Sequence, residues 1–142
     1  MELMDGQREQ QVWQRVRSGT ALAEQLIEMI SAEWEAAAAY LLLSRKYGSR
    51  QSGALYRMFQ REQAHAACLK GIYTMLTGQK PNIPKGRTGN DANLRSCYGR
   101  EMHCLARYEQ YADHPEFGPV FARLAQEERE HCLMLLQLLG KG

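Results

Sequence analysis

The sequence predicts an all-α protein: a four-helix bundle of two antiparallel helical hairpins joined by a crossover loop. Glycines and prolines divide the chain into four long segments. Within each segment apolar residues recur at steps of three and four, the spacing that keeps side chains on one face of a helix. Strands are not expected, because β-branched and polar residues nowhere alternate over a useful length.

Glycines delimit the first predicted hairpin. A Ser-Gly-Thr triplet separates a polar N-terminal segment from the first long helix, and Gly48 ends that helix. Gly78 ends the second helix, because glycine readily adopts the left-handed conformation that closes a helix. The short connection makes these two helices antiparallel neighbours. The predicted elements are a polar segment that can form a short helix over residues 1–19, and helices over residues 20–47 and 53–77.

A loop with two prolines and three glycines, residues 78–91, separates the two hairpins. At about 3.3 Å per residue it can run back along a helix of about 25 residues, which is about 38 Å long. The third helix is therefore expected to begin at the same end of the bundle as the second. This helix covers residues 92–113, and the fourth begins between Glu116 and Pro119 and runs to residue 139.

Each half of the chain carries the same set of residues. A lone glutamate is followed by a tyrosine seven residues later, and a Glu-x-x-His segment begins 29 residues later in the first half and 27 in the second. The glutamates and histidines lie on the apolar stripes of the predicted helices, away from their charged faces. The chain therefore contains one module twice. The first copy consists of Glu33, Tyr40, Glu62 and His65, and the second of Glu101, Tyr108, Glu128 and His131.

Four carboxylates in an apolar core predict a two-metal site. An ionised carboxylate in a dry interior costs several kcal/mol unless it is paired or binds a metal. Two divalent cations balance four such charges, and carboxylates with one imidazole per metal suit iron or manganese. Residues 20–142 are therefore expected to form one bundle domain that holds two iron ions, with manganese or a mixed iron/manganese pair as the alternative. The predicted ligands are Glu33, Glu62, His65, Glu101, Glu128 and His131.

The two tyrosines are expected to support the glutamates of the opposite half. Seven residues correspond to about 10.5 Å of rise along a helix, so neither hydroxyl is expected to reach the glutamate of its own helix. Tyr40 is therefore predicted to hydrogen-bond a carboxylate of the half that contains Glu101, and Tyr108 a carboxylate of the half that contains Glu33, which would orient these ligands.

Other residues near the module have simpler expected roles. The solvated face is the expected position of Glu35, Glu127 and Glu130, although one of these residues, or Glu109, could swing in as a seventh ligand. The four cysteines show no metal-binding spacing and are expected to be buried free thiols.

Over residues 20–139 the chain resembles the ferritin-like superfamily, and within it the rubrerythrin-type di-iron domain. Residues 120–131, VFARLAQEEREH, are similar to the fourth-helix ligand segment of that family, and residues 31–40, SAEWEAAAAY, to its first-helix segment. The resemblance implies a di-iron or iron/manganese oxidoreductase that reacts with hydrogen peroxide or oxygen in oxidative-stress defence. It also implies an external electron donor protein, because the paired C-x-x-C motifs of a rubredoxin module are absent from the sequence.

Apart from organic oxidations by a di-iron bundle, two other functions remain open from the sequence alone. The first is a ferroxidase or iron-handling protein, from which the oxidised iron leaves as product. The second is a non-enzymatic helical interaction protein with a vestigial metal site. Metal content separates the second of these from the di-iron oxidoreductase.

Bulk composition limits the partners. A formal net charge of +2 over 142 residues gives no reason to expect nucleic acid or a membrane surface as partner. No apolar run reaches the 18 or more residues that span a bilayer, and the polar N-terminus lacks the apolar stretch of a signal peptide. A cytoplasmic location is expected, and a homodimer is favoured because the N-terminal segment and the long loop offer docking surfaces.

Overall fold

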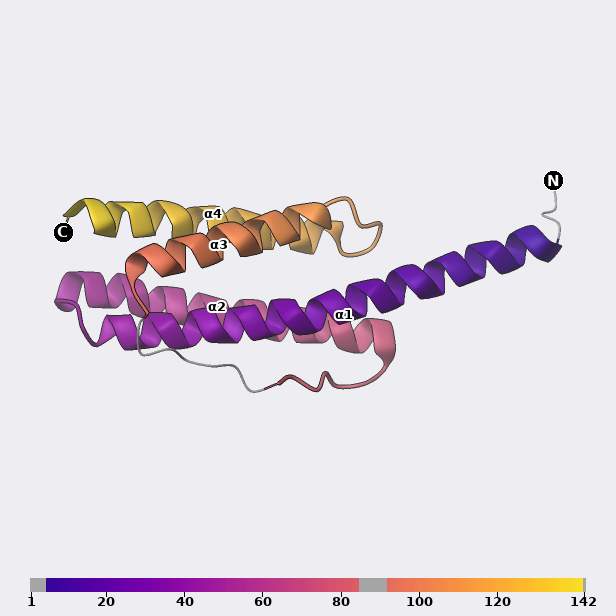
Figure 1. Ribbon diagram of the computed structural model, residues 1–142, viewed down its shortest axis with the longest axis horizontal. Helices are drawn as coiled ribbons and strands as arrows, with labels where there is room; N and C mark the ends of the chain where they lie inside the picture. Colours follow the sequence, from indigo (N-terminus) through magenta and orange to yellow (C-terminus); the bar gives the residue numbers. More distant parts are fainter. Residues whose placement is uncertain (1–4, 85–91, 142) are drawn as a thin grey trace.

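Four helices make up the computed structural model, which describes residues 5–84 and 92–141 (Figure 1). No strand occurs among these residues, so the predicted all-α four-helix bundle is confirmed. None of the helices combines the length and the apolar character that crossing a membrane requires, within the residues described. The helices are α1 (Asp5–Ser44), α2 (Ser49–Thr77), α3 (Leu94–Gln110) and α4 (Gly118–Lys141).

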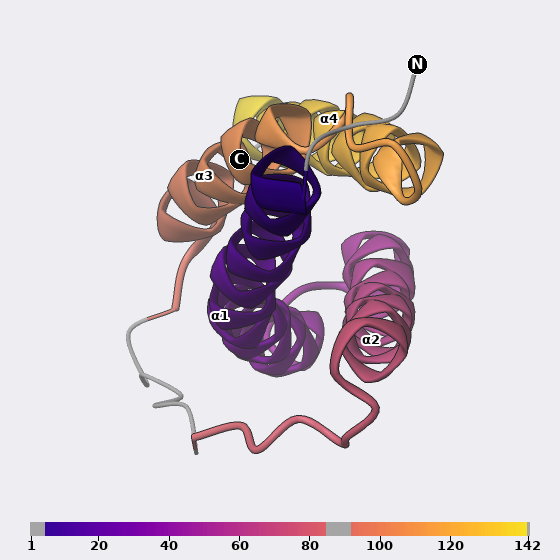
Figure 2. The same ribbon diagram turned by 90° about the vertical axis from the view of Figure 1, so that its right-hand side faces the viewer.

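The helices pack as two hairpins that face each other. Helix α1 packs along α2, and α3 packs along α4. Figure 2 shows the two pairs end-on, with α1 next to α3 and α2 next to α4. Because α2 ends at one end of the bundle and α3 begins at the other, these two helices run in the same direction (Figure 1). The predicted crossover between the hairpins is thus the observed topology.

Helix α1 is longer than predicted. It begins at Asp5 and continues through the Ser18-Gly19-Thr20 triplet, so the predicted interruption at residue 20 is wrong. A glycine inside a helix costs only about 1 kcal/mol relative to alanine, and the glutamine, glutamate and arginine residues around it favour a helix. Figure 1 shows the N-terminal part of α1 projecting beyond the other three helices.

Glycine positions fix the ends of α2. Helix α1 stops at Ser44, earlier than predicted, and Gly48 is the extended residue that precedes α2, with φ −65° and ψ 164°. Gly78 ends α2 as predicted: its φ of 73° lies in the left-handed region, and its N–H donates to the carbonyl of Thr74 at 2.8 Å. A side chain at this position would be strained by the backbone conformation alone.

Side chains define the starts of the two later helices. The Asn93 side chain accepts from the Ser96 N–H at 2.8 Å and so caps α3. Before α4, the His114 ring accepts from the N–H of Phe117 at 3.0 Å. Gly118, the first residue of α4, lies so close to the carbonyl oxygen of Ala112 that an added Cβ would be 2.6 Å from it. This close approach requires glycine.

The core consists of two apolar clusters with a polar layer between them. The first cluster is centred on Leu26, Ile30 and Phe121, and the second on Leu43, Leu55 and Leu135; all of these side chains are buried. Between them in the sequence of every helix lie the buried glutamates and histidines. Three cysteines are buried as predicted, whereas Cys68 lies on the exposed side of α2.

Candidate metal centre

All six predicted ligands lie at the middle of the bundle and are buried. The most exposed of them, His65, has a relative exposure of only 3%. Each helix contributes at the same level: α1 and α3 supply one glutamate each, and α2 and α4 supply one Glu-x-x-His pair each. The residues are Glu33, Glu62, His65, Glu101, Glu128 and His131.

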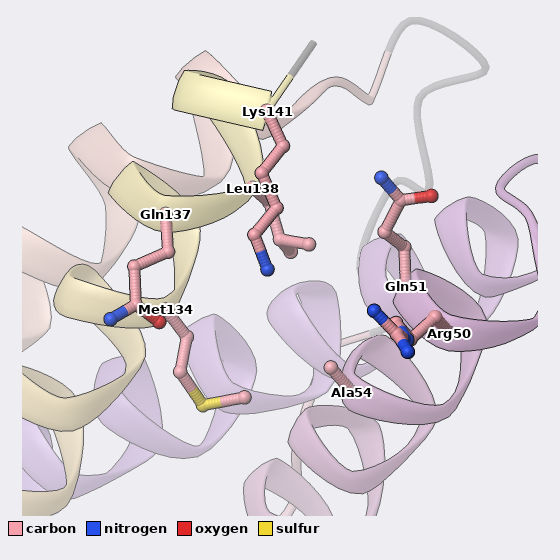
Figure 3. Close-up of a pocket in the computed structure, with 7 residues that line it drawn as sticks. All are labelled: Arg50, Gln51, Ala54, Met134, Gln137, Leu138 and Lys141. Atoms are coloured by element: carbon pink, nitrogen blue, oxygen red, sulfur yellow. The ribbon is translucent and has the colours of Figure 1, made fainter.

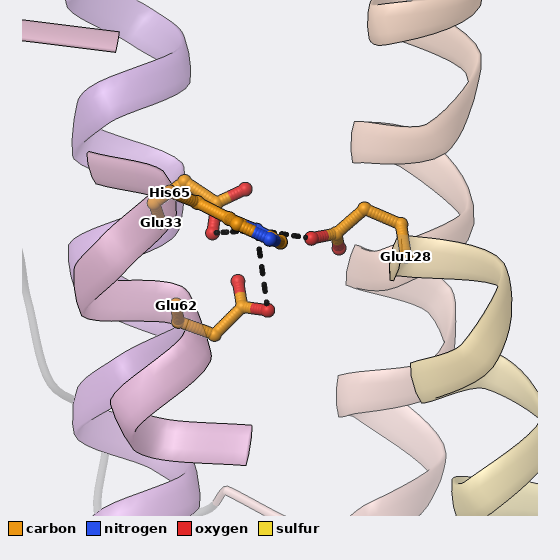
Figure 4. A group of neighbouring side chains, drawn as sticks. All are labelled: Glu33, Glu62, His65 and Glu128. Atoms are coloured by element: carbon orange, nitrogen blue, oxygen red, sulfur yellow. Dashed lines mark ion pairs between the residues drawn. The ribbon is translucent and has the colours of Figure 1, made fainter. Parts of the chain in front are cut away.

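The ligand atoms form two groups that share two glutamates. Within each group the carboxylate oxygens and the imidazole nitrogen lie within 4.8 Å of one another. Glu62 and Glu128 belong to both groups. Figure 4 shows the first group, in which Glu33 and His65 join the shared pair; Glu101 and His131 join it in the second. The arrangement provides two adjacent positions that could each hold a metal ion.

Each histidine faces the Glu-x-x-His glutamate of the other half. His65 Nδ1 lies 2.8 Å from Glu128 Oε1, and His131 Nδ1 lies 2.7 Å from Glu62 Oε1. Although these distances are short, both nitrogens lack a hydrogen-bond partner among the described residues. Ligand atoms around a shared cation also approach one another closely without forming hydrogen bonds, and the histidine nitrogens and glutamate oxygens have this arrangement.

Six buried carboxylate oxygens also lack a hydrogen-bond partner, like the two histidine nitrogens. They are buried and accept no hydrogen bond from any described residue: one oxygen each of Glu33 and Glu101, and both oxygens each of Glu62 and Glu128. Leaving a buried polar atom unpaired costs about 1–3 kcal/mol, and more for a charged group. Eight such atoms directed at one centre form groups that could hold a metal ion.

The two tyrosines donate hydrogen bonds to the remaining oxygens of Glu33 and Glu101. The Tyr40 hydroxyl donates to Glu101 Oε1 at 2.5 Å, and the Tyr108 hydroxyl donates to Glu33 Oε1. The predicted crossed contacts between the halves are confirmed. Because one oxygen of Glu33 and of Glu101 is occupied in this way, each of these residues offers a single oxygen to one metal position. Glu62 and Glu128 offer two oxygens each, as a bridge between two positions requires.

Without metal, the clustered carboxylates cannot all be ionised. Burial, and then the negative charges of Glu33 and Glu101, raise the pKa of Glu62 well above its usual value. Burial also favours the neutral form of Glu33, but the adjacent side chains of Glu62, His65 and Tyr108 outweigh it and lower the pKa of Glu33. The surroundings of Glu62 thus favour its protonated form in the metal-free centre.

Both tyrosines are held in their protonated form. The pKa values of Tyr40 and Tyr108 are raised well above the usual 10.0, chiefly by burial and then by the negative charge of the adjacent carboxylate. A phenol that keeps its proton is a permanent hydrogen-bond donor to the glutamate beside it.

One contact to a candidate ligand was not predicted from the sequence. Glu127, assigned to the solvated face, approaches the outer ring nitrogen of His65: its Oε2 lies 3.2 Å from Nε2, and its side chain is only 19% exposed. Its position directly before Glu128 places it at the edge of the apolar stripe. That edge position was the available signal, but only the approach of α2 shows that Glu127 contacts a histidine.

The other glutamates beside the ligands do not join the centre. Glu130 pairs with Arg61 at 2.7 Å, and Glu109 pairs with Arg129 at 2.5 Å. Neither these residues nor Glu35 and Glu127 belong to the two ligand groups. The structure therefore brings together six candidate ligands and no seventh from this set.

A surface pocket elsewhere on the molecule is not the metal centre. It lies between the start of α2 and the end of α4, where Arg50 and Lys141 face each other across it (Figure 3). Its floor includes Met134 and Leu138, which pack in the second apolar cluster. The residues that line it include no carboxylate and no imidazole, so it offers none of the ligand chemistry described above.

Comparison of the chain with family models, with curated proteins and with solved structures gave no match. The interpretation of the centre therefore depends on its own geometry and on the residues of the repeated module.

Proposed function

We propose that the protein is a di-iron, or iron/manganese, oxidoreductase of the rubrerythrin type within the ferritin-like superfamily. It would react with hydrogen peroxide or oxygen and serve in oxidative-stress defence. The observation that supports this proposal best is the set of eight buried, unpaired oxygen and nitrogen atoms, which falls into two groups with two shared glutamates.

The chemistry of the ligand atoms favours iron or manganese. The two groups contain carboxylates and one imidazole each, and no thiolate belongs to either group. Oxygen-rich sites with imidazole suit iron and manganese, whereas thiolate sites select softer metals. If all four glutamates are ionised, two divalent cations neutralise them, and this opposes the burial and the repulsion that raise the pKa of Glu62.

The protein residues have separate roles in this proposal. Glu62 and Glu128 would bridge the two positions and keep them close, while His65 and His131 would supply one nitrogen to each. Tyr40 and Tyr108 hold the remaining glutamates in place and stay protonated because burial raises their pKa values. The apolar clusters on both sides exclude water from the centre. When bound, a redox-active metal pair supplies two electrons and Lewis acidity.

The test begins with metal content. Protein reconstituted anaerobically with ferrous iron is dialysed and its metal measured by elemental analysis; two ions per chain are expected. The reduced protein is then mixed with hydrogen peroxide or with oxygen, and oxidation is followed by absorbance. The matched control is Glu62→Gln, which keeps the size of a shared ligand but removes its charge.

The outcomes separate the proposal from its alternatives. Oxidised iron that stays bound and can be reduced again by an external donor supports the oxidoreductase. Oxidised iron that leaves the protein supports a ferroxidase or iron-handling role instead. A chain that binds well below one metal ion contradicts both and supports the helical interaction protein. The proposal also includes an electron donor protein, a cytoplasmic location and a homodimer; sedimentation of the metal-loaded protein tests the last of these.

A further inference from the structure

The two candidate metal positions are not equivalent, because their histidines differ on the side away from the centre. His65 Nε2 lies 3.2 Å from Glu127 Oε2. No carboxylate of the described residues lies within 4.0 Å of His131 Nε2, and the edge of the Tyr40 ring packs against that imidazole at a centroid distance of 6.1 Å. The outer nitrogen of one histidine therefore has an anionic partner, and that of the other has none among the described residues.

The repeated module explains the difference. Glu127 immediately precedes the glutamate of its Glu-x-x-His segment, and the residue in the same place of the other segment is Arg61. The two residues meet across α2 and α4, with Arg61 Nε 3.5 Å from Glu127 Oε1. The guanidinium thus holds the carboxylate beside His65 by its second oxygen. At this position of the Glu-x-x-His segments the two halves carry opposite charges.

A carboxylate on Nε2 improves Nδ1 as a metal ligand in two ways. A neutral imidazole carries one proton, and an acceptor at Nε2 keeps that proton there, so that the Nδ1 lone pair faces the centre. The negative charge also increases the electron density of the ring, and such partners stabilise metal binding through the ligand that they contact. His131 has neither advantage from the residues described.

We propose that Glu127 is a positioning residue that makes the two metal positions unequal. The position formed by Glu33, His65 and the two shared glutamates takes a divalent cation before the position formed with Glu101 and His131. This inference rests on the proposed metal centre, which the first titration below tests separately.

The first experiment identifies which position fills first. Metal-free protein is titrated with Mn²⁺ by calorimetry, and wild type is compared with Glu33→Gln and Glu101→Gln, a matched pair because each glutamate has one tyrosine partner. Glu101→Gln is expected to keep the tight first step and lose the second. Glu33→Gln is expected to lose the tight step. Equal first-step affinities in the two variants would overturn the proposal.

The second experiment tests Glu127 itself. Glu127→Gln removes the charge and keeps the size, and the affinity of the first Mn²⁺ is expected to fall about 10- to 100-fold. Glu130→Gln is the matched control, because Glu130 also pairs with Arg61 but does not touch His65; its first-step affinity should equal that of wild type. An unchanged first step in Glu127→Gln, or an equal loss in both variants, contradicts the role of Glu127.

These results distinguish the inference from the function on which it rests. Wild-type protein that binds no Mn²⁺ and no ferrous iron refutes the metal centre and the inference together. Wild-type protein that binds two ions, with Glu33→Gln and Glu101→Gln interchangeable, refutes the inference alone. Circular dichroism of each metal-free variant establishes that any loss of affinity does not reflect unfolding.

Discussion

Replacing Tyr40 with phenylalanine removes one oxygen atom and keeps the packing of the ring. In the structure this hydroxyl is fully buried and donates to Glu101 Oε1 at 2.5 Å. A hydrogen bond to a charged group contributes about 1.5–3 kcal/mol to stability, against about 0.5–1.5 kcal/mol for an ordinary one. The variant also leaves Glu101 Oε1 buried without its donor. We therefore expect Tyr40→Phe to lower the free energy of unfolding by about 1.5–3 kcal/mol.

This loss corresponds to a measurable change in melting temperature. With an unfolding entropy of about 2.1 cal/mol/K per residue, a chain of 142 residues has about 0.3 kcal/mol/K in total. The Tm of Tyr40→Phe should thus fall by about 5–10 °C in thermal melts followed by circular dichroism. Tyr98→Phe is the control: Tyr98 is half-buried on α3, and its hydroxyl makes no hydrogen bond to the described residues. Its Tm should change little.

The same variant separates structural support from metal binding. Tyr40 contacts the oxygen of Glu101 that does not face the centre, so Tyr40→Phe should still bind two metal ions per chain. Its rate of peroxide-driven oxidation should change, because the ligand is no longer held in one orientation. Tyr108→Phe should behave in the same way through Glu33. A Tm loss no larger than that of Tyr98→Phe, or the loss of a metal ion, would refute this reasoning; unchanged kinetics in both variants would make the tyrosines core residues only.

Three further predictions concern the metal-free protein and two glycines. Removing metal should leave the helical circular dichroism spectrum intact, since the two apolar clusters lie outside the centre; a random-coil spectrum would contradict this. The metal-free protein should lose stability as pH rises above 4.5, because the pKa of Glu62 is raised in the folded state, which therefore binds more protons than the unfolded chain until pH passes that raised value. The raised pKa of His65 likewise lowers stability as pH rises, whereas the lowered pKa of Glu33 affects stability only below pH 4.5. Urea denaturation at a series of pH values measures how the free energy of unfolding depends on pH. A free energy of unfolding that does not change with pH would contradict this prediction. Gly118→Ala should cost about 1–3 kcal/mol because its Cβ would meet the Ala112 carbonyl at 2.6 Å. Gly71→Ala, in open space on α2, should gain about 0.5–1 kcal/mol; equal effects of the two substitutions in urea denaturation would show that the close contact is relieved.

The bundle and its six candidate ligands could be predicted because their signals are local and periodic. A helix repeats every 3.6 residues, so a glutamate such as Glu33 among apolar residues at steps of three and four must face the core. The separation of seven residues between Glu33 and Tyr40 likewise fixes how far apart they lie on one helix. For this reason the tyrosine contacts between the two halves could be predicted from the sequence. The loops could be located from glycine and proline because the effect of these residues on the backbone is also local.

The helix ends were harder to predict from sequence. Gly19 does not interrupt α1 and Gly48 does not end it, although Gly78 ends α2. A single glycine shifts the local free energy by about 1 kcal/mol, so the residues around it decide whether the helix continues. The burial of Cys68 was also predicted wrongly. His65 and Leu69 on the same helix are buried, but the Cys68 side chain is exposed.

The sequence by itself therefore determined the fold class, the level at which the carboxylates and imidazoles lie, and the tyrosine that serves each half. Only the tertiary structure decided that Glu127 contacts His65 and that Arg61 holds it there. A residue at the centre of an apolar stripe faces the core whatever the neighbouring helix does. A residue at the edge of the stripe faces solvent or a partner according to how closely and at what rotation the next helix packs, and that depends on contacts between α2 and α4 that no local pattern encodes.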